Sequence, residues 1–240
     1  MNTLSDILKS SIPTYELQLP STGKTVSFRP FLVKEEKVLL IAQQSDDYDE
    51  ILRAIKNIIE SCFENIKNAG DLPLFDIEYL FINLRAKSVG ETVSPLFVCP
   101  HTGENIKLDI NLLDVTIDNK KEHDNKIKIK DDIILTMKYP SVNIVSASEE
   151  DEERTSGSDY FYDLASKCIE KIETKEEIID VSSVSKKEVS DFVDNLSNGQ
   201  FEKIMTFFST SPKLHLKVEY KTSDGEKREV TFSNLTDFFV

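Results

Sequence analysis

The sequence has little glycine, few cysteines and no long apolar run, and each shortage excludes a class of protein. Only 7 of the 240 residues are glycine. Gly-x-Gly-x-x-Gly does not occur, so we do not expect nucleotide binding by that glycine-rich loop. The three cysteines, Cys62, Cys99 and Cys168, are too widely spaced for a disulfide framework, which favours a reducing compartment. No run of about 18 apolar residues is present, so no helix is expected to cross a bilayer.

Positive charge is also scarce. The chain carries 29 Lys and Arg against 43 Asp and Glu, which gives a net charge of -14. An acidic surface repels nucleic acids and anionic membranes, so neither is expected as a partner. The first six residues lack the basic and apolar regions of a signal peptide, and we expect a protein of the cytoplasm. A hydrophobic content of 39% is too high for a disordered chain.

The spacing of apolar residues predicts an α+β fold with several projecting antiparallel hairpins. Alternating strands around Gly23 predict a hairpin over residues 15–28, and a second hairpin is expected over 214–232. Helical spacing predicts helices over 1–12, 33–44, 48–63, 75–87, 159–172, 185–196 and 200–208. Shorter strands are expected over 91–98, 105–112, 126–129, 133–137 and 178–181, and the acidic run 149–153 is expected to be a solvated loop.

Similar turns suggest two related halves. Aligning Gly103 with Gly225 places Ile110 on Phe232, and a short Leu-containing segment follows each hairpin. Shared turn chemistry explains the match equally well. Residues 118–126 are strongly polar, so we expect one domain over 1–117 and a second over 125–240.

The chemistry-bearing residues do not form a recognisable active site. Cys99-Pro100-His101 resembles half of a zinc knuckle, but the second hairpin has Lys221 and Ser223 where further ligands are needed. No metal or cofactor is therefore expected, and the protein is not expected to be an enzyme. A metal-dependent hydrolase using Cys99, His101, Asp131 and Asp132 is the least favoured alternative.

Two segments combine cations with dense apolar residues and are candidates for protein docking. The first surrounds Phe31 and the second surrounds Arg85, and the apolar C-terminus also needs something to pack against. The predicted partner-binding residues are Phe31, Leu32, Lys34, Arg85, Lys87, Phe238 and Phe239. The alternative is that the apolar residues are core and the cations neutralise nearby acids and helix ends.

Four segments resemble the baseplate hub assembly proteins of T4-type contractile-tailed bacteriophages. They are residues 28–37, 82–91, 98–114 and the stretch from 199 to 214. Their order and spacing carry the resemblance, because none is a chemical signature by itself.

The resemblance implies a late phage protein that helps to build the baseplate hub. It implies hub proteins as partners, and either a chaperone-like assembly factor in the host cytoplasm or a permanent hub subunit in the virion. Relatives of this kind often carry Cys-Pro-x-Cys knuckles in their hairpins. This chain has Thr102 at the position of the second cysteine, so the implied metal is in doubt here.

Overall fold

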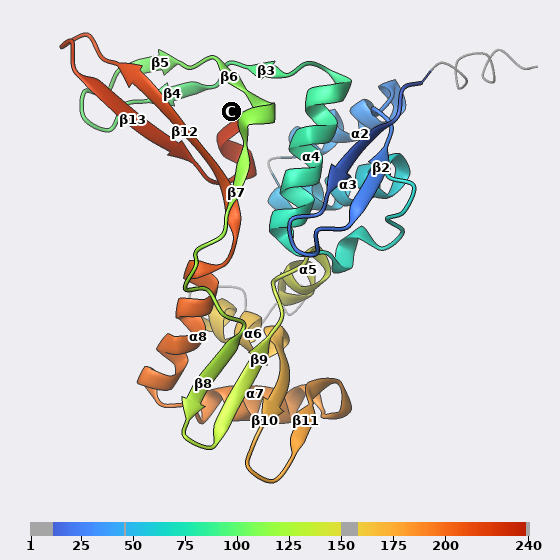
Figure 1. Ribbon diagram of the computed structural model, residues 1–240, viewed down its shortest axis with the longest axis vertical. Helices are drawn as coiled ribbons and strands as arrows, with labels where there is room; N and C mark the ends of the chain where they lie inside the picture. The colour runs from blue at the N-terminus through green and yellow to red at the C-terminus, as the bar shows by residue number, and fades with distance from the viewer. Residues whose placement is uncertain (1–11, 46, 150–157, 239–240) are drawn as a thin grey trace, which may run out of the picture. The chain divides into compact units, whose positions relative to one another are not determined.

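The computed structural model describes residues 12–45, 47–149 and 158–238, and it has the expected α+β architecture (Figure 1). The expected helix over 1–12, most of the acidic run 149–153 and Phe239 fall outside the described residues. The chain forms two compact units, Met1–Asp118 with Lys213–Val240, and Asn119–Pro212. This division differs from the expected segments, since the C-terminal strands belong with the N-terminal residues.

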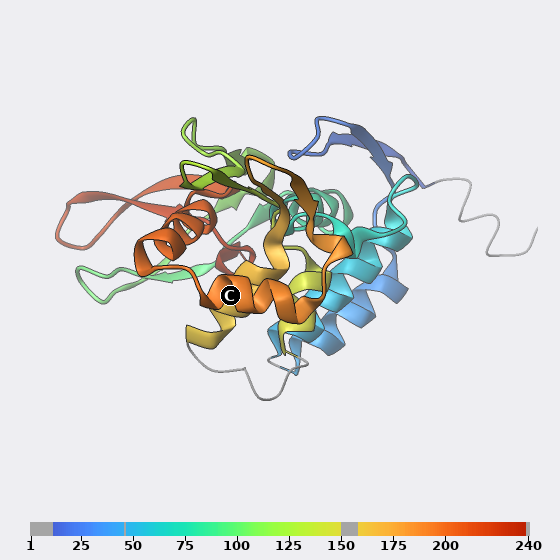
Figure 2. The ribbon, with the colours of Figure 1, turned by 90° about the horizontal axis from the view of Figure 1, so that it is seen from below.

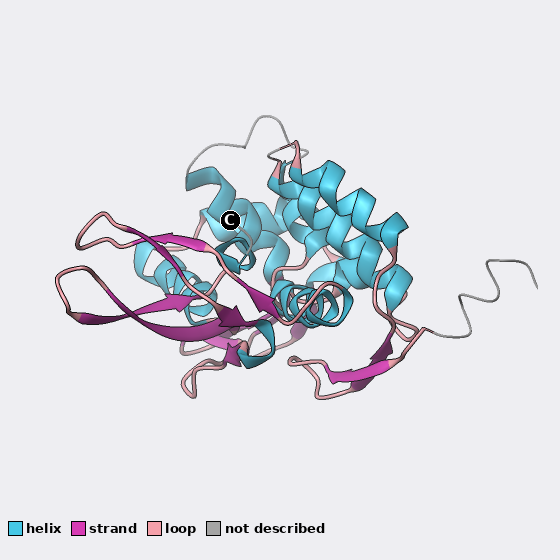
Figure 3. Ribbon diagram, turned by 90° about the horizontal axis from the view of Figure 1, so that it is seen from above, coloured by secondary structure: helices cyan, strands magenta, loops and turns pink. Residues whose placement is uncertain are grey.

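The described part of the first unit contains three α-helices, α2 (Val33–Gln43), α3 (Tyr48–Cys62) and α4 (Leu74–Ser88), which Figure 3 shows in cyan. Their positions confirm the expected helical stretches. The carboxylate of Asp47 caps α3 by accepting the backbone N–H groups of Asp49 and Glu50. Helices α2 and α4 each contact α3. The apolar faces of α3 and α4 form the centre of this core.

A short hairpin precedes these helices. Strands β1 (Tyr15–Gln18) and β2 (Thr25–Phe28) pair as expected, and Gly23 has a φ of 68° in the turn. Gly23-Lys24-Thr25 matches the end of a phosphate-binding loop, but Gln18 stands where the first glycine of that loop is required. The tripeptide also leads into a strand instead of a helix, so it is part of a hairpin turn.

The C-terminal segment joins the first unit through strand pairing. Strand β12 (Lys213–Lys221) pairs with β13 (Lys227–Phe232) and with β7 (Thr116–Asp118), in the order β13-β12-β7. Two further pairs complete the unit, β3 (Thr92–Val93) with β6 (Ile110–Asn111) and β4 (Leu96–Val98) with β5 (Asn105–Lys107). The turns at Gly103 and Gly225 therefore lie in one unit instead of marking two related halves.

Short 3-10 helices follow both of these hairpins. They are η2 (Leu112–Asp114) and η4 (Leu235–Phe238), and a third, η1 (Ala69–Asp71), lies between α3 and α4. The similarity between residues 96–114 and 213–238 is therefore local, a hairpin and the turn after it.

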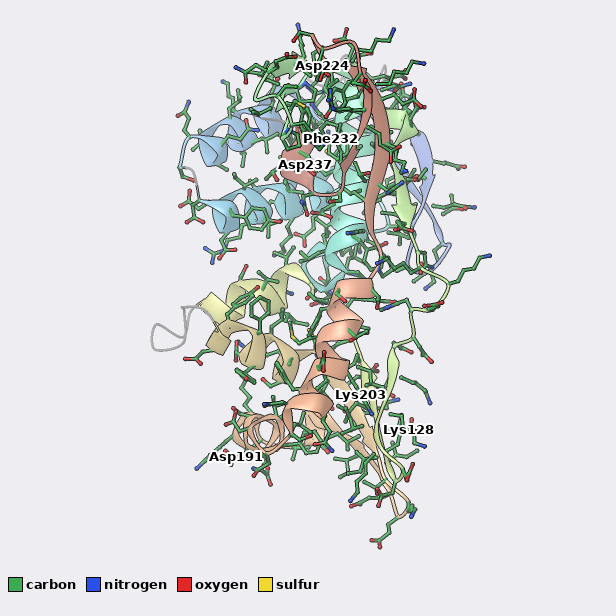
Figure 4. The ribbon with its side chains drawn as sticks, turned by 90° about the vertical axis from the view of Figure 1, so that its left-hand side faces the viewer. Lys128, Asp191, Lys203, Asp224, Phe232 and Asp237 are labelled. Atoms are coloured by element: carbon green, nitrogen blue, oxygen red, sulfur yellow. The ribbon has the colours of Figure 1, made fainter. Side chains whose placement is uncertain are left out.

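The second unit is a four-stranded antiparallel sheet covered by helices on one face (Figures 1 and 4). Its strands run in the order β11 (Ile178–Asp180), β10 (Ile169–Glu173), β9 (Ile133–Met137) and β8 (Lys126–Lys130). Its helices are α5 (Val142–Glu149), α6 (Ser158–Cys168), α7 (Lys186–Asp194) and α8 (Asn198–Thr210), with η3 (Val181–Ser183) before α7. Lys203 on α8 donates a hydrogen bond of 2.8 Å to the backbone carbonyl of Lys128 on the edge strand.

One expected helix is too long. The helix predicted over 159–172 ends at Cys168, and Ile169–Glu173 is strand β10, where Ile172 pairs with Leu135 of β9. Ile169 and Ile172 are spaced for a helix face and also suit a strand, so sheet pairing decides the outcome. The capping box expected at Ser185 and Glu188 is confirmed. None of the helices described in the two units is long and apolar enough to cross a membrane.

A candidate protein-docking surface on the first unit

A groove of about 480 Å³ lies between α2, α4 and the segment that follows α4. Helix α2 contributes Leu39 and Leu40 to its wall, and α4 contributes Arg85. Phe31 and Phe238 also line the groove, and both are buried. The groove thus combines these apolar side chains with polar ones, which include Glu36 in the α2 wall and Arg85 in the α4 wall.

Helix α2, next to this groove, is poorly covered by the rest of its unit. Val33, Leu40 and Ile41 keep 66%, 51% and 68% of their surface exposed, and only Glu35 and Ala42 of this helix are buried. The apolar residues of α2 surround the helix instead of forming one stripe. Apolar side chains that are exposed together on one element are typical of an interaction surface, so the exposed part of α2 has the composition of an interface.

An ionic cluster holds the start of α2 in place. The Glu35 carboxylate lies 2.9 Å from Arg29 Nη2 and accepts the backbone N–H of Leu32 at 2.8 Å. Burial raises the pKa of Glu35, but these hydrogen bonds and the nearby Lys34 outweigh it, and the pKa lies below its ordinary value. Arg29 also donates to the backbone carbonyl of Ser61, so this cation is structural.

Three of the seven predicted partner-binding residues meet in the groove. Phe31, Arg85 and Phe238 all line it, although they are far apart in the sequence. Arg85 donates to the backbone carbonyl of Gly90 at 3.2 Å, and burial lowers its pKa. Phe238 is only 1% exposed and packs on Phe232. It therefore supports the groove lining from inside the core and presents little surface that a partner could contact.

The remaining predicted residues lie elsewhere on the unit. Leu32 and Lys34 are exposed at the start of α2, and Lys34 Nζ lies 3.2 Å from Glu35. Lys87 does not line the groove, because residues two apart on a helix face different sides. Its Nζ contacts Glu91 at 2.6 Å and lies over the ring of Tyr15.

The sequence analysis did not identify Leu39, Leu40, Val89, Val93 and Pro95 as groove residues. A signal was available for α2, since the run from Val38 to Ile41 is apolar in four consecutive positions. Such a run cannot be covered from one side of a helix. The sequence carries no comparable signal for Val93 and Pro95, because only the folded arrangement of the segment after α4 places them in the groove.

The half-knuckle at Cys99 lies in the first unit, and Asp131 and Asp132 lie in the second. Within the described parts of the chain, no three His, Cys, Asp or Glu residues are grouped so as to hold a metal ion. The Cys99 side chain is buried, with its Sγ 3.5 Å from the hydroxyl of Tyr220. Burial raises the pKa of this thiol, but hydrogen bonds from Thr102, Tyr220 and two backbone N–H groups lower it to about 7.

Comparison with known proteins finds similarity to bacteriophage baseplate proteins along nearly the whole chain. The profile of a family described as T4 bacteriophage base plate protein matches residues 12–240. The baseplate hub assembly protein gp26 of Enterobacteria phage T4 is 26% identical over 231 residues, which cover 94% of this chain and 97% of that protein. No solved structure matches the chain.

Proposed function

Because the chain belongs to the T4 bacteriophage base plate protein family, we propose that it takes part in tail assembly by binding subunits of the baseplate hub. The uncovered apolar surface of α2 and the adjoining groove carry this proposal. The match to a baseplate hub assembly protein along nearly its full length supports the same role. We propose that the binding is transient and takes place in the host cytoplasm.

The proposed occupant is a hub subunit that presents an apolar patch and carries a net positive charge as a whole. Helix α2 has two lysines and two glutamates and is itself neutral, whereas the whole chain carries a charge of -14. Two copies of so acidic a chain repel each other at long range, and a basic partner is attracted. Charge therefore favours a different protein over self-association at this surface.

The binding surface proposed here is narrower than the set predicted from the sequence. It consists of Phe31, Leu32, Leu40 and Arg85, with Phe238 as support and Lys34 at its border. Lys87 serves as an internal comparison, because it is a cation on the same helix as Arg85 that does not line the groove.

The test measures binding of purified hub subunits to matched variants by calorimetry or pull-down. Leu40→Glu places a charge on the apolar surface, and Arg85→Glu reverses the charge in the groove wall and removes the donor to the Gly90 carbonyl. Each is expected to weaken binding at least about tenfold. Lys87→Glu and Ile178→Glu are expected to leave it nearly unchanged, since Lys87 does not line the groove and Ile178 is an exposed apolar residue of the second unit. Equal losses in all four variants would count against the proposed surface.

A permanent place in the virion is the alternative. Probing both purified virions and infected-cell extracts for this protein distinguishes a transient assembly factor from a permanent subunit. Recovery with hub subunits from the extract, and absence from the virion, supports transient binding. A fixed copy number in the virion instead identifies a structural subunit, whose interfaces are permanent.

A further inference from the structure

The tips of two hairpins meet in the first unit. Hairpin β4–β5 lies beside hairpin β12–β13, and both project in the same direction (Figures 1, 2 and 3). The ring of Phe97 packs edge-on against Tyr220, with centroids 5.3 Å apart. Beyond this contact, the Glu104 carboxylate accepts the backbone N–H of Ser223 at 3.1 Å and also the Ser223 hydroxyl.

Paired hairpin turns of this kind suit a metal ion, and the resemblance described above implies one. The donor set here does not fit a zinc ion. Cys99 and the exposed His101 are two possible ligands in the β4–β5 turn, whereas Thr102, Tyr220 and Thr222 supply only hydroxyl groups. Structural zinc sites use four Cys or His ligands, so these residues cannot replace them.

A protein cation lies at the junction as well. Arg228 Nη1 and Nη2 donate to the two carboxylate oxygens of Asp224 at 3.0 and 2.7 Å, and Nη1 also donates to the hydroxyl of Thr222. Arg228 is directly opposite Tyr220 in the strand register, so both side chains lie on the same face as the Cys99 thiol. Asp224 is at the end of the hairpin (Figure 4).

The electrostatics of the junction agree with this geometry. Hydrogen bonds with Asp224 and the negative charges of Asp224 and Cys99 raise the pKa of Arg228. The same guanidinium, with the Thr222 hydroxyl, holds the pKa of Asp224 well below its usual range. The guanidinium of Arg228 thus occupies the polar centre of the β12–β13 turn, between the Asp224 carboxylate and the Thr222 hydroxyl. A divalent cation at the same place would be repelled by it.

We infer that this junction is built without a metal ion: Arg228 fixes the β12–β13 turn through Asp224 and Thr222, and contacts of Cys99 with Tyr220 and of Glu104 with Ser223 then join the two hairpin tips. The bidentate arginine–carboxylate pair is charge-assisted and is stronger than a neutral hydrogen bond, and it holds the turn that presents Ser223 to Glu104. This inference concerns the hairpins alone and does not depend on the proposed hub binding.

The first test needs only the parent protein. Purified full-length protein is analysed for zinc by mass spectrometry, and its thermal melt is recorded with and without excess EDTA. We expect far less than one zinc per chain and the same melting temperature in both buffers. Stoichiometric zinc, with a lower melting temperature after its removal, would overturn the inference.

The second test measures local opening of the tips by amide hydrogen exchange with mass spectrometry. Arg228→Gln removes the cation, and Lys217→Gln is the control because it breaks an exposed ion pair with Glu229 on the same hairpin. We expect exchange in peptides covering 96–107 and 213–232 to become about tenfold faster in Arg228→Gln and to change little in Lys217→Gln.

Arg228→Lys keeps the charge without the bidentate geometry and is expected to give an intermediate rate. Equal exchange in Arg228→Gln and Lys217→Gln would show that Arg228 does not hold the tips. If Arg228→Gln fails to fold, Arg228→Lys and the zinc analysis of the parent still decide the question.

Discussion

Helices α2 and α3 are neighbours in the first unit, but the rest of the unit covers them very differently. Seven residues of α3 are buried, and its apolar residues recur at helical spacing along one face. Helix α2 has a similar share of apolar residues, but they surround the helix and only two of its residues are buried. The comparison teaches that apolar periodicity, more than apolar content, decides whether a helix completes its own core or leaves surface for a partner.

The largest expected effect comes from removing equal volumes from the two helices. Ile59→Ala on α3 creates a cavity at a fully buried position and is expected to reduce the free energy of unfolding by about 2–5 kcal/mol. Ile41→Ala on α2 is expected to change it by less than about 0.5 kcal/mol, since 68% of that side chain is exposed. Urea unfolding followed by circular dichroism measures both. Comparable losses would mean that α2 is covered within the monomer.

A smaller effect is expected at Glu35, which holds α2 in place where packing contributes little. Glu35→Gln weakens the ion pair with Arg29 and is expected to reduce stability by about 2 kcal/mol at pH 7. The pKa of Glu35 is lowered in the folded protein, so its contribution is present above the unfolded value of 4.5 and is lost as the pH falls through the folded value.

The pH dependence of Glu35→Gln is therefore its most specific signature. The stability curves of the parent and the variant should begin to approach each other near pH 4.5 and converge as the pH falls through the lower, folded pKa of Glu35. Glu91→Gln is the matched control, because Glu91 forms an exposed ion pair with Lys87 and is expected to change stability by less than about 0.5 kcal/mol. A Glu35→Gln variant whose difference from the parent stays constant from pH 7 down to the lowest pH at which both fold would rule out the ionic contribution.

The sequence predicted helix α3 better than it predicted the groove, because the groove is formed by segments that meet only in the folded protein. The expected and observed limits of α3 differ by one residue, because its periodic apolar face and the Asp47 cap are both local signals. The groove was not predictable as a unit, since Phe31, Arg85 and Phe238 meet only when η4 packs beside α4. Arg85 and Lys87 looked equivalent in the sequence, and only the helical geometry separates the groove residue from its neighbour.

Local sequence signals also predicted the two similar turns but not their place in the fold. Gly103 and Gly225 correctly predicted hairpin turns, and both have positive φ angles, 72° and 84°. Strand pairing across a long sequence separation then decided where the hairpins lie. Lys213 pairs with Asp118, and this contact brings the C-terminal hairpin into the first unit. Neither residue has a local feature that specifies this partner.

The smallest expected effect concerns Glu78 on α4, where the pH dependence has the opposite sign to that of Glu35. Burial and the nearby Asp237 raise the pKa of Glu78 to about 7, although its carboxylate accepts the backbone N–H of Leu235. The folded protein therefore binds this proton more tightly than the unfolded chain does. Ionisation of Glu78 lowers stability progressively as the pH rises from 4.5 to about 7.

Glu78→Gln keeps an acceptor for Leu235 and removes the buried charge, so it is expected to stabilise the protein by about 1 kcal/mol above pH 7 and to be nearly neutral below pH 4.5. Thermal melts of the parent and the variant across this range measure the difference, with Glu64→Gln as an exposed control. A variant that is less stable than the parent at pH 8 would mean that the ionised carboxylate supports η4. In that case the support beneath the groove, at Phe238, would itself depend on the charge of Glu78.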